Sequence, residues 1–482
     1  MRITIISFKD DNFGDVLIKI CFRNLLTSAL ENLGFSSDSF SLSYMNLKEV
    51  EEELLMQSNL ICFAGGGLFG LSYLDFNDYL VKIIEIAEKY QIPVIFSSMG
   101  INNMDVSDER SYALRGILNS SCIRAFSVRE NGELFRKNMR DDLRVAEVCD
   151  PAVWTKYVYA KEVSPILKKK EELHTPVIGI NVVRGGLFKD NGHPWPMGTQ
   201  LQFLADVKEM LEEAGLDYCF YTNGSTLDNN TLFALATRYQ LPAEKIRLID
   251  STRELVEAIA SFDGVLAMRM HSSIIAYALD IPSVNLLWNE KIAHFYKAIG
   301  HEERVLSEES WNASAIKETL LPFVLKRGER GSISEGQQQR KEEYLMTVYT
   351  FLRQALKDIF TENDSNAEAA AFAQVSNSFD GAGPDVSDDI ADMKFKLCQG
   401  MRRYYDQFEK LKDTKAEKKT LEKEKRILQN EQRQLESELA KQKKENEALS
   451  GKLKRIESNR VYRFLAGGLR LLKRIKKTVM KG

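Results

Sequence analysis

The chain has 482 residues with a hydrophobic fraction of 44%, which is enough to fill the cores of two or three domains. Its formal net charge is −3, yet residues 452–482 contain eleven Lys or Arg residues and a single acid, Glu457. This asymmetry argues against general nucleic-acid binding and favours a localised anionic partner for the basic tail.

No run of residues approaches the ~20 apolar positions of a membrane-spanning helix, and residues 1–11 lack the apolar core of a secretory signal. The six cysteines have no metal-ligand spacing and fall mostly in apolar patterns, which is typical of buried, reduced thiols. We therefore expect a cytoplasmic protein without a metal, whose membrane contact would be peripheral, on the inner face of the cell membrane.

Residues 1–155 alternate short apolar strands with helical patterns, and this alternation predicts a doubly wound, Rossmann-like α/β domain with a parallel sheet. The predicted strands are 3–7, 40–43, 60–64, 94–98, 125–128 and 145–148, and the predicted helices are 16–30, 79–89, 109–118 and 132–137. The charged and less periodic stretch 155–175 is interpreted as the connection between domains.

A second series of the same kind fills residues 175–335. Its predicted strands are 177–183, 218–222, 247–249, 265–268 and 283–287, and its predicted helices are 201–214, 231–239, 253–261, 273–278 and 292–299. Two such domains of similar size predict a GT-B-like arrangement with a cleft between them. A helix over 336–360, with an apolar stripe from Leu345 to Ile359, is expected to pack on both domains.

Three segments of different composition follow. Residues 361–394 are acidic and poor in apolar side chains, which predicts a disordered linker. Residues 395–458 carry an apolar heptad with Asn446 at a core position, which favours a two-stranded coiled coil and a homodimer, with a single solvated helix as the alternative. Residues 459–482 predict a basic amphipathic helix on an anionic membrane surface, or an interaction helix for another protein.

The most informative stretch runs from Asp263 to Lys291. A buried strand is expected to deliver Arg269 and His271 to its carboxyl end, where open α/β sheets bind ligands, and Ser272 is expected to help cap the next helix. A fixed cation, a titratable imidazole and a helix N-terminus suit an anion that also needs a proton. The alternative is that Arg269 pairs with a structural carboxylate and His271 only supports the fold.

This stretch also carries a family resemblance. Arg-Met-His, followed by a small-residue helix, Ile-Pro and a downstream Lys, is similar to the carboxyl-terminal signature of the polysaccharide pyruvyl transferase family. Four further motifs fall in the family's order: Asn-Phe-Gly-Asp at 12–15, Gly-Gly-Gly-Leu-Phe at 65–69, Ser-Met-Gly at 98–100 and Ser-Val-Arg-Glu at 127–130. The resemblance covers roughly residues 1–300 and implies the same two-domain, GT-B-like architecture.

The resemblance also implies an activity. The family transfers a pyruvyl group from phosphoenolpyruvate to two hydroxyls of a sugar, forming a cyclic ketal. The acceptor would be a sugar or lipid-linked saccharide of an envelope polysaccharide or exopolysaccharide, and no cofactor is expected beyond phosphoenolpyruvate as donor substrate. The second domain would bind the donor and the first domain the acceptor.

The chemistry of that donor assigns roles to the cations and histidines. Arg269 and Arg184 are expected to bind its anionic groups, because a planar guanidinium matches a carboxylate or a phosphate, and Lys291 would add a point charge. The enol methylene needs a proton, for which His271 is the proposed general acid. His193, in a Gly-His-Pro-Trp loop, is the second choice.

The acceptor side is expected from the first domain. Asn12 could hydrogen-bond a sugar hydroxyl, and Asp15 or Asp10 could accept its proton. Asp15 follows Gly14 where a helix should start, so helix capping is at least as good an interpretation of this carboxylate as catalysis.

Two glycines, an arginine and a serine complete the candidate substrate-binding residues. Gly66 and Gly67 predict a backbone nest for a sugar or an anion, because their loop follows the third strand, whereas a dinucleotide fingerprint follows the first. The other two predicted substrate-binding residues are Arg129, in the Ser-Val-Arg-Glu motif, and Ser272, beside His271. The dipeptide at 150–151, Asp-Pro, is interpreted as a turn.

Two other functions remain open at this stage. A GT-B glycosyltransferase would use a nucleotide sugar in envelope polysaccharide synthesis, but the second domain has no acidic pair spaced to hold a ribose and a donor sugar. A non-catalytic scaffold would recruit an envelope assembly complex through its coiled coil. The scaffold predicts that deleting residues 395–482 abolishes function while substitutions in the cleft do not.

Overall fold

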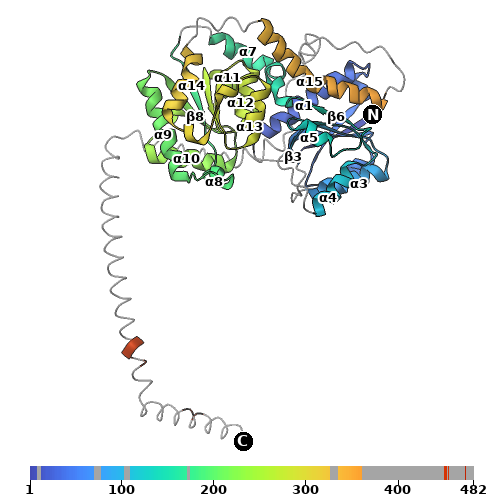
Figure 1. The fold of residues 1–482 in the computed structure, drawn as a ribbon, viewed down its shortest axis with the longest axis horizontal. Helices are drawn as coiled ribbons and strands as arrows, with labels where there is room; N and C mark the ends of the chain where they lie inside the picture. The colour runs from blue at the N-terminus through green and yellow to red at the C-terminus, as the bar shows by residue number, and fades with distance from the viewer. Residues whose placement is uncertain are drawn as a thin grey trace. The chain divides into compact units, whose positions relative to one another are not determined.

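The computed structural model describes residues 1–7, 12–69, 77–101, 109–170, 174–325 and 335–360, together with 450–452, 454, 470 and 473. The chain divides into two units, residues 1–398 and 399–482. The first unit holds two six-stranded sheets, and all recorded strand pairs in both are parallel (Figure 1). The predicted fold class, two doubly wound α/β domains in a GT-B-like arrangement, is confirmed. The predicted linker, coiled coil and basic tail lie almost wholly outside the described residues.

The first sheet has the strand order β2-β1-β3-β4-β5-β6. Its strands are β1 (Arg2–Ser7), β2 (Ser41–Asn46), β3 (Leu60–Phe69), β4 (Val94–Ile101), β5 (Ile123–Val128) and β6 (Arg144–Glu147). Its helices are α1 (Phe13–Glu31), α2 (Glu52–Met56), α3 (Asn77–Lys89), α4 (Glu109–Leu118) and α5 (Gly132–Arg136). Each predicted strand and helix has its counterpart here, and among the described residues of this domain the 3-10 helix η1 (Ser37–Ser39) and the five-residue α2 were not predicted.

Alternate residues of these strands face two different helical layers. Leu60 and Cys62 of β3 belong to the core under α1, whereas Ile61 and Phe63 belong to the core under α2, α3, α4 and α5. The ring of Phe63 stacks on that of Phe96 in the next strand, with centroids 4.2 Å apart. Both faces of the sheet are therefore buried, which is why these strands are continuous apolar runs in the sequence.

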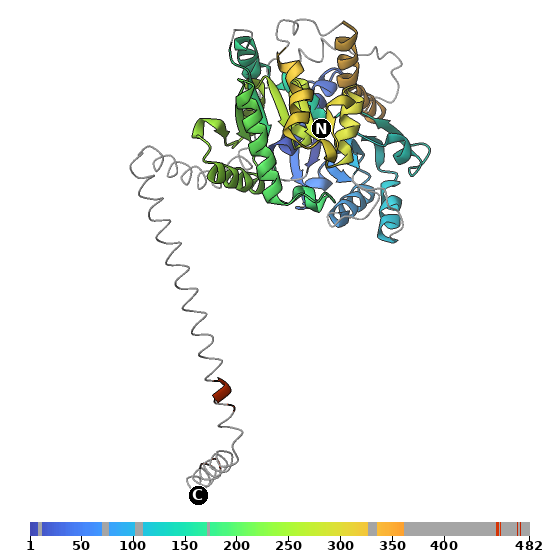
Figure 2. The same ribbon diagram turned by 60° about the vertical axis from the view of Figure 1, so that its left-hand side comes forward.

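The second sheet has the strand order β12-β11-β10-β7-β8-β9. Its strands are β7 (Val177–Asn181), β8 (Asp217–Tyr221), β9 (Ile246–Arg247), β10 (Gly264–Ala267), β11 (Ser283–Leu286) and β12 (Val305–Leu306). Its helices are α8 (Leu187–Asp190), α9 (Met197–Glu213), α10 (Thr226–Tyr239), α11 (Thr252–Ser261), α12 (Met270–Ala278), α13 (Glu290–Ala298) and α14 (Ala313–Leu325). Figure 2 shows α9, in green, along one face of this sheet, where its apolar side chains share a core with β7.

The stretch interpreted as a connection between the domains is largely helical. It contains η2 (Pro151–Trp154), α6 (Thr155–Val158) and α7 (Ala160–Lys169). Three apolar residues of α7, Val163, Ile166 and Leu167, lie at helical spacing and pack on the core under α1. The charges around this short stripe hide it in the sequence.

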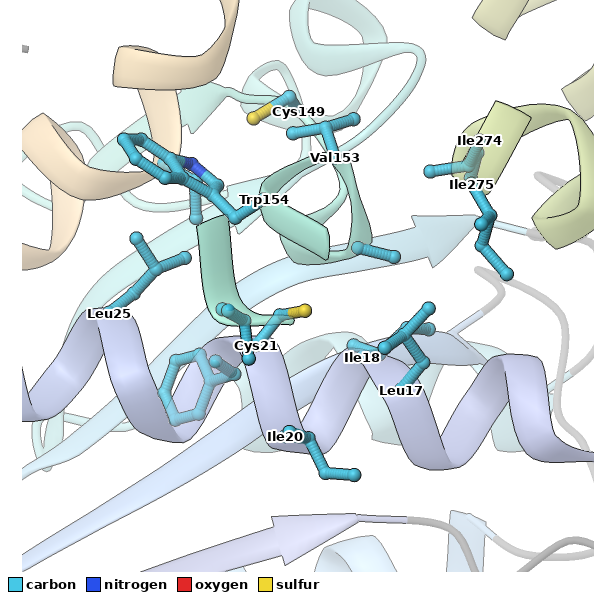
Figure 3. Packing of buried hydrophobic residues seen from close by; sticks show 14 of the residues in the cluster. Leu17, Ile18, Ile20, Cys21, Leu25, Cys149, Val153, Trp154, Ile274 and Ile275 are labelled. Atoms are coloured by element: carbon cyan, nitrogen blue, oxygen red, sulfur yellow. The ribbon is translucent and has the colours of Figure 1, made fainter. Parts of the chain in front are cut away.

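One hydrophobic core continues from the first domain into the second. Figure 3 shows Leu17 and Ile18 of α1 in the same cluster as Trp154 of η2 and Ile274 and Ile275 of α12. All five side chains are buried. Apolar burial therefore holds α12, which belongs to the second domain, close to the start of α1 in the first.

Helix α15 (Glu335–Phe360) packs along this core and lies beside α1 (Figure 1). Leu345 and Leu352 are buried in it, and Trp154 Nε1 donates a 2.9 Å hydrogen bond to the Leu345 carbonyl. At the other domain, Lys341 Nζ donates to the Tyr277 carbonyl at the end of α12, at 2.8 Å. The helix therefore contacts both domains.

No helix among the described residues is long and apolar enough to cross a membrane. Cys21, Cys62, Cys122 and Cys149 are buried free cysteines, as the apolar context predicts, and Cys219 is half-buried. Burial raises the pKa of the Cys149 thiol to about 12, so this thiol stays protonated at neutral pH.

The two strand orders fix where a ligand site should lie. In each sheet the order reverses beside the first strand of the domain, between β1 and β3 and between β7 and β10. Open parallel sheets bind ligands outside the carboxyl ends of the strands at such switch points. Asn12 and His271 follow β1 and β10 respectively, so both switch points contribute to the same junction.

The buried face of α15 gives a test of its contribution to stability. Leu352→Ala should lower the free energy of unfolding by about 2–5 kcal/mol, because the Leu352 side chain is fully buried and its removal leaves a cavity. The matched control is Leu325→Ala on α14, where the leucine is 58% exposed and the change should stay within about 0.5 kcal/mol. Urea titrations measure both, and equal effects would contradict the packing of α15.

Candidate functional site

The first segment of the site is the N-terminus of α1. Asn12 is the N-cap residue, and its Oδ1 accepts a 3.0 Å hydrogen bond from the Gly14 backbone N–H. Asp15 lies in the first turn and does not cap the helix, so the capping interpretation of Asp15 is wrong. A Cβ atom on Gly14 would lie 2.6 Å from the Cβ of His271, so the bare glycine lets α1 approach that histidine.

His271 is the second residue of α12. It therefore lies in the first turn of that helix, whereas it was predicted at the end of the preceding strand. Its Nδ1 is 3.8 Å from Asp15 Oδ1 and its Nε2 is 3.6 Å from Asp150 Oδ2. The residue is only 7% exposed, and its Nε2 has no hydrogen-bond partner within the described part of the chain. A buried imidazole thus faces one carboxylate at each ring nitrogen, both beyond hydrogen-bonding distance.

Asp150 connects His271 to a buried arginine. Its Oδ2 pairs with Arg129 Nη1, and its Oδ1 accepts a 2.8 Å hydrogen bond from the Ala152 backbone N–H at the start of η2. Burial by itself would raise the pKa of Asp150, but the charges of Arg129 and His271 outweigh it and hold that pKa below its ordinary value. Asp150 is therefore an ionised group of the site as well as the predicted turn former.

Arg129 is buried between two carboxylates. Besides Asp150 it has Glu130, whose Oε2 is 3.8 Å from Arg129 Nε. Glu130 is itself fixed, because its Oε1 accepts a 2.7 Å hydrogen bond from the Ile101 backbone N–H. Gly100 leaves room for the guanidinium, since a Cβ there would collide with Arg129 Nη2. The Ser-Met-Gly and Ser-Val-Arg-Glu motifs thus meet at one arginine.

Lys291 contributes a second, half-buried cation. It lies in the first turn of α13, where Asn289 is the N-cap, and so follows the end of its strand by one loop. Burial lowers the pKa of Lys291 to about 8, and the positive charge of Arg129 acts in the same direction, while Glu130 and Asp15 oppose it. The interactions with all three charges place Lys291 in the same cluster.

Arg269 has the structural carboxylate that the alternative interpretation expected. Its Nε and Nη2 donate to the two oxygens of Asp228, at 3.0 and 2.7 Å, and Asp228 is fully buried. Asp228 Oδ1 also accepts from the Arg184 backbone N–H at 2.8 Å. The Arg184 guanidinium pairs with Asp190 instead, at 2.6 Å. Asp228 therefore draws the main chain at Arg184 and the side chain of Arg269 together.

The predicted helix-capping role of Ser272 is wrong. The N-cap of α12 is Arg269, without a side-chain cap bond, and Ser272 Oγ donates instead to Asn223 Oδ1 at 2.8 Å. Asn223 Oδ1 also accepts from Asn181 Nδ2 at 3.0 Å. The Asn223 carbonyl accepts a 2.8 Å bond from the backbone N–H of Phe13, which ties the second domain to α1.

The remaining candidates are placed as follows. Gly66 and Gly67 lie in the last part of β3, and the Gly66 carbonyl is close to Gly100, which also borders Arg129. His193 Nδ1 is 2.5 Å from Glu308, and its ring packs on Trp311, so the structure does not bring His193 to the His271 cluster. Asp10 lies outside the described residues.

The site therefore combines residues from both sequence-predicted and unpredicted positions. Asp15, Arg129, His271 and Lys291 come from the motifs, whereas Asp150, Asp228, Asn181 and Asn223 were missed. A signal existed for three of the missed residues, because Asn181 lies in the last part of the predicted strand 177–183, while Asn223 and Asp228 follow the next predicted strand. Together the cluster offers a buried imidazole, two cations and three carboxylates, those of Asp15, Glu130 and Asp150, which suits proton transfer beside an anionic group.

Comparison with solved structures finds proteins of low sequence identity to this chain. UDP-N-acetylglucosamine 2-epimerase from Rickettsia bellii is 12% identical with a TM-score of 0.45, over 74% of this chain and 95% of that one. The corresponding epimerase from Neisseria meningitidis is 11% identical with a TM-score of 0.45, over 75% and 100%. An O-GlcNAc transferase from Thermobaculum terrenum is 10% identical with a TM-score of 0.34, over 80% and 69%.

No curated protein matches the sequence. The model of one protein family does match, with the description polysaccharide pyruvyl transferase, over residues 12–290. This range begins at the N-cap of α1 and ends at the first residue of α13, so it includes Asp15, Arg129, Asp150 and His271. The chain belongs to the polysaccharide pyruvyl transferase family and is a transferase of polysaccharide modification.

Proposed function

We propose that this protein transfers a pyruvyl group from phosphoenolpyruvate to a sugar of a cell-envelope polysaccharide or exopolysaccharide precursor, forming a pyruvate ketal. The observation that carries the proposal is the position of His271, buried between Asp15 and Asp150 with Arg129 and Lys291 in the same cluster. The reaction needs a proton for the donor's methylene carbon and cations for its carboxylate and phosphate, and this cluster has both.

His271 is the general acid in this proposal. Its imidazolium gives a proton to C3 of phosphoenolpyruvate, and the π electrons of the C2–C3 bond form the new C–H bond. A sugar hydroxyl oxygen bonds to the cationic C2, and its proton passes to Asp15, 3.8 Å from the imidazole. A second hydroxyl oxygen then bonds to C2 as the C2–O bond to the phosphate breaks, and its proton passes to the departing phosphate, so the products are the cyclic ketal and hydrogen phosphate.

The anionic groups of the donor have several possible partners. The Arg129 guanidinium is buried and Lys291 is half-buried, and cations shielded from water attract an anion more strongly than fully exposed ones. Arg269 can also take part, since Asp228 fixes the plane of its guanidinium. Asp150 holds Arg129 beside His271 and so keeps anion binding and proton transfer together.

The first test replaces the acid. His271→Asn should leave binding of phosphoenolpyruvate to the full chain within about threefold but lower ketal formation by about 10²–10⁴-fold, the usual contribution of a general acid. Calorimetry measures binding, and phosphate release with a panel of saccharide acceptors measures transfer. His301→Asn, at a half-buried histidine paired with Glu303, is the control.

Two results would contradict this proposal. If the full chain binds a nucleotide sugar and no phosphoenolpyruvate, the protein uses a different donor. If His271→Asn transfers as fast as the unchanged protein, His271 is not the acid, and the reaction class stands without it.

A pH test isolates Lys291. Below about pH 8 its ammonium is charged, and above that pH it becomes neutral and no longer attracts the donor's anionic groups. We expect kcat/KM for phosphoenolpyruvate to fall towards tenfold per pH unit above about pH 8. Lys291→Arg should remove this fall, because an arginine stays charged.

The control for Lys291 lies on the same helix. Lys297→Arg changes an exposed lysine of α13 and should leave the pH profile as it is. An alkaline fall that persists in Lys291→Arg would assign the titration to another group.

The close approach at Gly14 gives a further test. Gly14→Ala keeps an ordinary helical backbone but forces its methyl group against the His271 ring, so transfer should fall at least tenfold. Gly116→Ala, on α4 with open space around the glycine, is the matched control and should keep full activity. Thermal unfolding of both variants separates a displaced histidine from a lost fold, and normal transfer by folded Gly14→Ala would contradict the contact.

A further inference from the structure

Asn223 lies between the N-termini of two helices. Its main-chain carbonyl accepts from the N–H of Phe13, the first residue of α1, at 2.8 Å. Its side-chain Oδ1 accepts from the hydroxyl of Ser272, in the first turn of α12, also at 2.8 Å. Phe13 precedes Gly14, and Ser272 follows His271. Asn223 is therefore hydrogen-bonded to the sequence neighbours of the two residues, Gly14 and His271, at which the helices meet.

The orientation of the Asn223 amide follows from its partners. Asn181 Oδ1 accepts from the Arg269 backbone N–H at 2.9 Å, so Asn181 must present its Nδ2 to Asn223. The Asn223 atom that receives both this N–H and the Ser272 hydroxyl is therefore the oxygen. Its Nδ2 then points away from both groups.

The Asn223 Nδ2 is a buried donor without a partner. Asn223 is fully buried, and within the described residues its Nδ2 has no hydrogen-bond acceptor. Unpaired donors of this kind are rare in folded proteins, because burial removes their hydrogen bonds to water. His271 Nε2 is also buried without a hydrogen-bond partner within the described residues, and His271 directly precedes Ser272, which bonds to Asn223. Two buried polar atoms without a partner, on residues linked in this way, indicate a place for a ligand.

We infer that the Asn223 side-chain amide binds an anionic oxygen of the donor substrate, in its carboxylate or its phosphate. This inference rests on the proposed function, in which the donor is an enolpyruvyl phosphate. Helix N-termini carry partial positive charge, and Asn223 is bonded to two of them, α1 and α12. Lys291 and Arg129 add full charges to the same cluster. An oxygen that approaches this donor group is therefore favoured when it is negative.

The backbone of Asn223 has a separate role, which lets the side chain be tested alone. Gly224 has φ +91° and packs directly on the Phe13 ring, where a Cβ would collide. That contact and the bond from Phe13 N–H to the Asn223 carbonyl hold the two domains together whichever side chain stands at 223. Substitution of the side chain should therefore leave the junction in place.

Two substitutions at 223 test the inference in the full chain. Asn223→Asp keeps the oxygen for Ser272 and Asn181 and replaces the N–H donor with a second, negative oxygen. Asn223→Ala removes the donor without adding charge. We expect the Kd for phosphoenolpyruvate to rise at least tenfold in Asn223→Ala and more in Asn223→Asp. Asn230→Asp, which adds the same charge on the exposed side of α10, should leave the Kd within twofold.

The outcomes separate the inference from the proposed function. If phosphoenolpyruvate binds the unchanged protein and Asn223→Ala, folded by thermal unfolding, binds it equally well, the inference is overturned and the proposed function stands. If the unchanged protein does not bind phosphoenolpyruvate, both are overturned. A merely structural role for the Asn223 amide predicts a lower melting temperature and an equal rise in the KM of the saccharide acceptor. A donor Kd that rises while the acceptor KM does not supports the inference.

Discussion

The contact between Gly14 and His271 is the constraint on which the site depends. α1 and α12 belong to different domains, and they meet where one residue has no side chain. The shared apolar core brings the two helices together, and the hydrogen bond from the Phe13 backbone N–H to the Asn223 carbonyl helps to fix their relative position. A histidine from the second domain can therefore stand between Asp15 and Asp150 of the first. Neither domain by itself would form this arrangement.

The fold was largely predictable because each sheet is covered on both faces. Buried parallel strands give short apolar runs, and the helices between them show a 3.6-residue period. The prediction failed where that signal is weak, as in α7, whose apolar stripe is three residues among charges, and in β12, which has two residues. At those places neighbouring elements determine the structure, and the local sequence does not reveal them.

The sequence predicted only those site residues whose type and local motif indicate a chemical role. His271 and Arg129 stand in recognisable motifs, but their partners are distant in sequence and look ordinary there. Asp150 precedes Pro151 and does initiate η2, as a turn former should. Its second contact, with Arg129, depends on strands β5 and β6 bringing the two together, and no local pattern contains that information. The same holds for Asp228 and Arg269, which are separated by 41 positions.

The balance of charge in the cluster explains why helix N-termini and side-chain amides contribute to the proposed binding of an anion. Arg129 and Lys291 interact with Asp15, Glu130 and Asp150, so carboxylates already match much of the positive charge of the cluster. In the proposed reaction, a donor with two anionic groups must then gain part of its stabilisation from groups whose attraction the carboxylates do not cancel. Helix N-termini and oriented amides supply such attraction without carrying a charge that needs a counter-ion. In the proposed reaction, this pairing leaves proton transfer to His271 and Asp15 and gives part of anion recognition to the neutral groups around Asn223.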